Sequence, residues 1–148
     1  MQTALLVLIV TIMTIPLVHV TFILFGAQLL AQVKRTALLS AHFSFLALFP
    51  LFHAHGLDAG AWLAIGGLTA PLDEVYGGLL GGVLGAWLAA IPIPLDWDRE
   101  WQKWPVTIVA GMYAGYLAGK VLGGTVLHGV RLASPAKAPT DAEKEKAT

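Results

Sequence analysis

Acidic and histidine side chains that could bind a metal ion gather at two places in the chain. Asp96, Asp98 and Glu100 alternate within five residues, and His53 and His55 are separated by one residue. Transfer of a phosphorus-bearing group needs an activated nucleophile and usually two metal ions held by several carboxylates and histidines. The acidic stretch contains no histidine, serine or threonine, and an extended backbone would point Asp98 away from the other two carboxylates.

We therefore expect no catalytic residue, no resident cofactor and no metal site. A single Mg²⁺ needs fewer protein ligands, and Asp96 with Asp98 would be the pair to hold it. The histidine pair has only Asp58 near it, which favours an interfacial pair over half of a metal site.

The amino-acid composition indicates whether the segments that carry these residues lie in water or in lipid. The chain has 148 residues, of which 57% are hydrophobic and 12% are charged. A soluble domain of this length still exposes about 30% of its unfolded-chain surface, and here too few polar side chains exist to cover it. Lipid is therefore the expected solvent. The formal net charge of zero leaves no basic face for nucleic acid.

Long stretches without charge predict four membrane-spanning helices, because about 20 apolar residues cross the hydrocarbon core. We expect them near residues 4–30, 37–55, 75–93 and 105–127. The 14 uncharged residues of segment 59–72 are too few to cross, so 57–72 is expected to be interfacial. Pro71 is placed in the first turn of the third span, with Asp73 and Glu74 at its positive end. Residues 1–131 thus form one all-α membrane domain with short loops, and 132–148 a disordered tail.

Three ionisable residues fall inside the expected spans. His19 and His42 lie in the middle of theirs, where each could mark a polar path, but a neutral histidine bonded to a neighbouring helix is the favoured interpretation. Lys120 lies in the last third of its span, where its side chain can reach the interface.

Two of the spans carry ridges of small residues, which allow helix backbones to approach closely in lipid. The ridges consist of Gly77, Gly81 and Gly85 in the third span and Gly111, Gly115, Gly119 and Gly123 in the fourth. They could pack against each other or receive a helix from another protein. We expect the longer ridge to form the partner surface.

The loop between these spans has the most distinctive sequence in the chain. Proline neither donates the backbone hydrogen bond nor tolerates a helical predecessor, so Pro92 and Pro94 end the third span. Pro105 opens the fourth. Trp97, Trp101 and Trp104 fall where aromatic rings sit at a membrane interface. These features predict a rigid turn anchored by tryptophan.

The segment Pro92-Ile-Pro-Leu-Asp-Trp-Asp-Arg99, followed by Trp101-Gln-Lys-Trp104-Pro and Gly-x-x-x-Gly-Tyr-x-x-Gly, resembles the PIG-F family of glycosylphosphatidylinositol (GPI) anchor assembly. A weaker second block begins at His19. The resemblance covers residues 17–130, with Glu100 where the family is expected to have proline. The family usually has six spans, so this chain is expected to lack the first two.

The resemblance implies a non-catalytic endoplasmic reticulum membrane subunit that stabilises a large ethanolamine phosphate transferase of the PIG-O or PIG-G type. It also implies that the motif residues Pro92, Pro94, Asp96, Trp97, Asp98, Arg99, Trp101 and Trp104 contact this partner. Lys144 and Lys146 resemble a cytosolic dilysine retrieval signal, which places the tail in the cytosol and loop 95–104 in the lumen. The alternative is a protein that guides or flips membrane lipid, with GPI lipid as a candidate.

Overall fold

The computed structural model describes residues 2–95 and 99–134, with side chains from residue 4 onward. The described residues form helices and connecting turns, with no strand among them. The long helical segments are α1 (Gln2–Leu24), α2 (Val33–Phe43) with η1 (Ser44–Leu48) and α3 (Phe49–His55), α5 (Glu74–Leu88) and α6 (Val106–Gly124). In the described part of the chain, four segments are long and apolar enough to span a membrane: Ala4–Leu24, Val33–His55, Glu74–Leu95 and Val106–Gly124.

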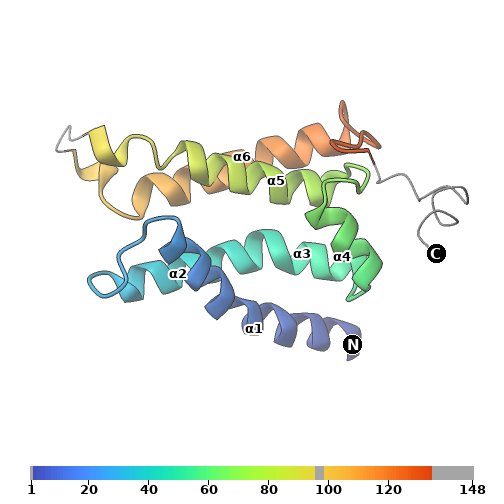
Figure 1. Ribbon diagram of the computed structural model, residues 1–148, viewed down its shortest axis with the longest axis horizontal. Helices are drawn as coiled ribbons and strands as arrows, with labels where there is room; N and C mark the ends of the chain where they lie inside the picture. Colours follow the sequence, from blue (N-terminus) through green and yellow to red (C-terminus); the bar gives the residue numbers. More distant parts are fainter. Residues whose placement is uncertain (1, 96–98, 135–148) are drawn as a thin grey trace, which may run out of the picture.

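These segments alternate in direction, so two sets of turns gather at opposite ends of the molecule (Figure 1). The turns after α1 and after α5 lie at one end. The short helix α4 (Ala59–Gly66) lies at the other, together with the N-terminus and the segment after α6. The side chain of Asp58 caps α4 by accepting a hydrogen bond from Ala61 N at 2.8 Å. At eight residues, α4 is too short to cross a bilayer.

The second segment is continuous from Val33 to His55, but it contains the π-helical turn η1. The backbone N–H of Phe49 donates to Ser44 O, five residues back. The next residue, Pro50, has no N–H and would crowd a carbonyl in a regular α-helical turn. A wider turn relieves this conflict, so the chain crosses the proline without ending the helix.

Helix ends differ from the sequence-based expectations by a few residues. α1 ends at Leu24 rather than near 30, because the chain turns through Gly26, whose φ is +103°. α5 ends at Leu88 rather than near 93, and the one-turn 3₁₀ helix η2 (Ile93–Leu95) follows. Pro71 precedes α5 instead of lying in its first turn. The expected cap is confirmed, since Asp73 Oδ1 accepts from Val75 N and Tyr76 N at 2.9 and 2.7 Å.

Backbone hydrogen bonds tie the two segments that flank the α5–α6 pair at the α4 end. Leu72 N–H donates to Val130 O at 2.8 Å, and Gly129 N–H donates to Leu72 O at 2.7 Å. Ala133 N–H donates to Leu68 O at 2.9 Å. We call these three bonds the backbone clasp.

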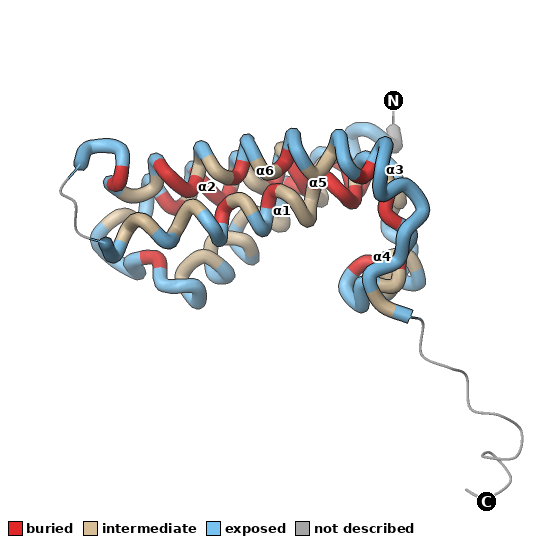
Figure 2. Tube along the Cα trace, turned by 90° about the horizontal axis from the view of Figure 1, so that it is seen from above, coloured by how far each residue is buried: buried red, intermediate tan, exposed pale blue. Residues whose placement is uncertain are grey.

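Buried residues line the inner sides of the helices, and most outward side chains are exposed (Figure 2). One core cluster lies at the α4 end around Leu51 and Tyr76, and a second lies around Leu39 and Met112. The exposed residues include many large apolar side chains, such as Leu17 at 68% and Leu24 at 81% exposure. An apolar exterior of this extent suits a surrounding lipid phase.

Candidate functional site

The glycine ridges of α5 and α6 face each other and form one seam. A Cβ atom added at Gly81 would overlap Gly115 O and lie 2.8 Å from Gly119 Cα. Added at Gly119, it would overlap Gly77 O and lie 2.8 Å from Gly81 Cα. The same close approach repeats along both ridges, at Gly77, Gly85, Gly111, Gly115 and Gly123. The two backbones are therefore in direct contact, which glycine alone allows.

This arrangement overturns the expectation that the ridge of α6 forms the partner surface. Every glycine of that ridge, from Gly111 to Gly123, has α5 or the residues beside it within contact distance. A single small-xxx-small ridge has the same sequence whether its partner helix belongs to the same chain or to another. The α6 ridge is therefore an internal seam, and another protein must contact a different face.

The turn after α5 is held together by one buried side chain, Gln102, in the one-turn helix η3 (Glu100–Gln102). Its amide Nε2 donates to Pro92 O at 2.9 Å, and its Oε1 accepts from Arg99 N at 3.1 Å. Both ends of the loop motif are thus joined through Gln102. Sequence analysis did not identify Gln102, because its structural role depends on the hydrogen bond to Pro92, ten residues earlier in the chain.

The loop tryptophans have different surroundings. Trp104 points toward α2, where its indole Nε1 donates to Thr36 Oγ1 at 3.3 Å. Trp101 is 47% exposed, so it lies at the surface of the loop. Asp96, Trp97 and Asp98 lie outside the described residues, as do Lys144 and Lys146. Of the loop charges that are described, Glu100 and Lys103 form an exposed ion pair.

Several of the remaining ionisable residues interact within the fold. His55 Nε2 lies 3.5 Å from Asp73 Oδ2, and Lys120 Nζ lies 2.9 Å from Glu74 Oε1. His42 was expected to bond a neighbouring helix, but its Nδ1 pairs with Leu38 O in its own helix at 2.8 Å.

The same expectation is wrong for His19, whose Nδ1 is buried without a hydrogen-bond partner. In the described part of the chain, no group of three or more histidine, aspartate or glutamate side chains could hold a metal ion.

Comparison with known proteins gives one consistent match. The family described as "GPI biosynthesis protein family Pig-F" matches residues 1–124. A Neurospora crassa protein named "Glycosylphosphatidylinositol anchor biosynthesis protein 11" is 57% identical over 127 residues, which cover 86% of this chain and 47% of that protein.

A mouse protein named "GPI ethanolamine phosphate transferase, stabilizing subunit" is 36% identical over 110 residues, covering 72% of this chain and 50% of the relative. This chain therefore spans about half the length of the curated relatives it matches. No solved structure matches it significantly.

The fold and its seam define a small all-α multi-pass membrane protein built around a glycine-packed helical hairpin. The family match extends over most of the chain and includes this hairpin. The protein belongs to the PIG-F family of GPI biosynthesis. Its relatives are named for GPI-anchor biosynthesis and for the stabilising subunit of GPI ethanolamine phosphate transferase.

Proposed function

We propose that this chain acts as a non-catalytic, stabilising membrane subunit of a GPI ethanolamine phosphate transferase complex. The observation that carries the proposal is its similarity to relatives named as this stabilising subunit. The loop also supports a non-catalytic role, since both the Nε2 and the Oε1 of Gln102 form hydrogen bonds to the loop backbone. The loop motif then positions a surface, and the transfer chemistry belongs to a partner.

The partner is a large catalytic subunit of the PIG-O or PIG-G type, held through transmembrane helices and through the loop motif. Opposite the seam, α6 carries an exposed apolar stripe of Leu117 and Val121 at helical spacing. Tyr113, one turn before Leu117, is partly exposed, and its ring also contacts His42 of α2. Arg99 and Trp101 are exposed on the loop that precedes α6. Arg99, Trp101 and the stripe together are the proposed partner surface.

The complex is proposed to reside in the endoplasmic reticulum membrane, with loop 95–104 in the lumen. The ends of the described chain support a common side for the two termini, because residue 2 and segment 125–134 lie at the α4 end (Figure 1). Retrieval through Lys144 and Lys146 would then require this end to face the cytosol.

Affinity purification of the full chain in mild detergent tests the assignment. We expect it to recover a large membrane protein with a luminal metallo-phosphotransferase domain. The double substitution Arg99→Ala with Trp101→Ala is expected to lower recovery at least fivefold with little change in the amount of this chain. Lys103→Ala is the matched control, because it alters an exposed loop residue whose known contact is with Glu100.

Full recovery of the transferase by the double variant would contradict the proposed surface. Metal-dependent transfer of ethanolamine phosphate by the purified chain alone would contradict the non-catalytic assignment. Neither outcome depends on the other.

A further inference from the structure

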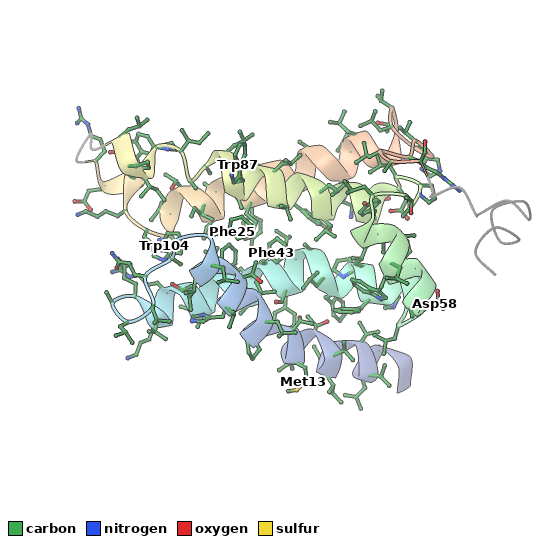
Figure 3. All side chains as sticks on the ribbon, viewed as in Figure 1. Met13, Phe25, Phe43, Asp58, Trp87 and Trp104 are labelled. Carbon is green, nitrogen blue, oxygen red and sulfur yellow. The ribbon has the colours of Figure 1, made fainter. Side chains whose placement is uncertain are left out.

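An apolar groove of about 680 Å³ lies between the C-terminal turns of α1 and the face of α5 that looks toward them. Large aromatic side chains surround it, and Figure 3 shows four of them close together at this end of the molecule. They are Phe25, Phe43, Trp87 and Trp104. Phe25 is 79% exposed and Trp87 is 60% exposed, so the groove opens onto the outer surface.

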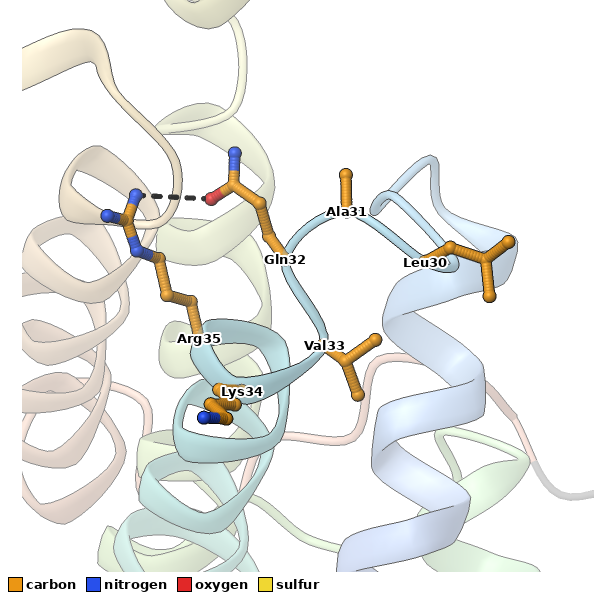
Figure 4. A pocket seen from close by; sticks show the side chains of 6 residues that line it. All are labelled: Leu30, Ala31, Gln32, Val33, Lys34 and Arg35. Atoms are coloured by element: carbon orange, nitrogen blue, oxygen red, sulfur yellow. Dashed lines mark hydrogen bonds between the residues drawn. The ribbon is translucent and has the colours of Figure 1, made fainter.

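A second hollow, of about 600 Å³, lies beside the turn of residues 30–35 at the same end of the molecule. Figure 4 shows the side chains of Arg35 and Gln32 reaching toward each other beside this turn. Arg35 Nη1 donates to Gln32 Oε1 at 3.3 Å and to Trp104 O at 3.4 Å, and both acceptors are neutral. Among the described residues, no carboxylate lies within ion-pair distance of Arg35 or Lys34.

Trp104 connects Arg35 with the apolar groove, because it lines the groove while its carbonyl accepts the hydrogen bond from Arg35. The cationic group of Arg35 therefore lies next to an apolar, aromatic-lined groove. Arginine binds phosphate oxygens well, since its planar guanidinium presents several donors in a fixed geometry. An occupant that matches both parts carries an anion at one end and an apolar chain directly behind it.

We propose that this combined site binds one glycerophospholipid, with an acyl chain in the groove and its phosphate at Arg35. The charge complementarity favours a phospholipid over a partner helix, whose apolar span would leave the guanidinium without an anion. The site uses no glycine of the seam, and it shares Pro94 and Trp104 with the loop motif.

Native mass spectrometry of the purified full chain, released from detergent with added dioleoyl phosphatidylglycerol, tests the proposal. We expect one retained phospholipid per chain and no retention of dioleoylglycerol, which has the same acyl chains without the phosphate. Arg35→Gln should weaken phospholipid binding about tenfold, the usual loss for one charge-assisted hydrogen bond. Lys103→Gln, which removes a positive charge from the same end, should leave binding within twofold.

A second pair of variants tests the groove itself. Val83→Phe enlarges an exposed side chain that lines the groove, whereas Val121→Phe makes the same change on the outer face of α6. The first should reduce retention at least fivefold and the second should not. Equal retention of the two lipids, or equal behaviour within either pair of variants, would overturn the proposal. The measurement needs no transferase, so it stands or falls separately from the proposed function.

Discussion

Replacing Gly81 with alanine is the most direct perturbation of the α5–α6 seam. The new Cβ would overlap Gly115 O, and its distance to Gly119 Cα would be 2.8 Å. Both atoms belong to backbone, so no flexible side chain can move aside. The two helices must separate by roughly 1 Å, which forfeits a quarter to a half of each dispersion contact.

The magnitude follows from the number of contacts in the seam. If it holds on the order of 40 atom pairs at ~0.15 kcal/mol each, losing about a third of that attraction costs about 2 kcal/mol. This agrees with the ~1–3 kcal/mol found for overpacked cores. The better helix propensity of alanine returns at most about 1 kcal/mol.

Gly82→Ala is the matched control, one residue along the same helix. Its Cβ would lie 3.8 Å from Tyr116 Cβ and 3.9 Å from Met112 O, which are ordinary contact distances. We expect it to be neutral or slightly stabilising. Unfolding in dodecyl maltoside micelles with increasing SDS, followed by tryptophan fluorescence, gives the two midpoints. A midpoint for Gly81→Ala equal to or above that of Gly82→Ala would refute the close-packed seam.

Three further predictions concern the caps, the loop and the topology. Asp73→Ala should lower the free energy of unfolding by about 1 kcal/mol, because it removes the N-cap of α5. Asp73→Asn should lower it by less, because asparagine still caps the helix, and the same micelle titration measures both variants. Gln102→Leu should open the loop to trypsin through the loss of two hydrogen bonds, about 1–3 kcal/mol in total, whereas Glu100→Gln breaks only an exposed ion pair and should leave cleavage unchanged. Tags placed at Thr148 and beside Arg99 should be protected from protease on opposite sides of the membrane, and protection on one side would disprove the four-span topology.

Charge spacing predicted the four membrane-spanning segments well, because in lipid a charge-free stretch of sufficient length has few alternatives to a helix. It predicted helix ends less well. The residues after Leu24 are as apolar as the helix, and only the positive φ of Gly26 ends α1. Hydrophobicity cannot distinguish an apolar turn from another helical turn.

The same limit applies to the site. Asp73 was recognisable as a cap because an acceptor at the start of a helix has a local role. Gln102 was not, since its importance depends on a contact with Pro92 that spacing does not encode. The glycine ridges were visible in the sequence, but their spacing could not distinguish an internal seam from an external one.

The backbone clasp gives the α5–α6 pair a mechanical character. The loop joins the two helices at one end, and the bonds of Leu72 with Gly129 and Val130 join them at the other. Sliding one helix past its neighbour by a turn, about 5.4 Å, would break the clasp and force seam glycines past each other's carbonyl groups. The α5–α6 pair therefore moves as one rigid body. A shape change on assembly is therefore expected where this pair packs against η1 and α3, and it would change the width of the groove between α1 and α5.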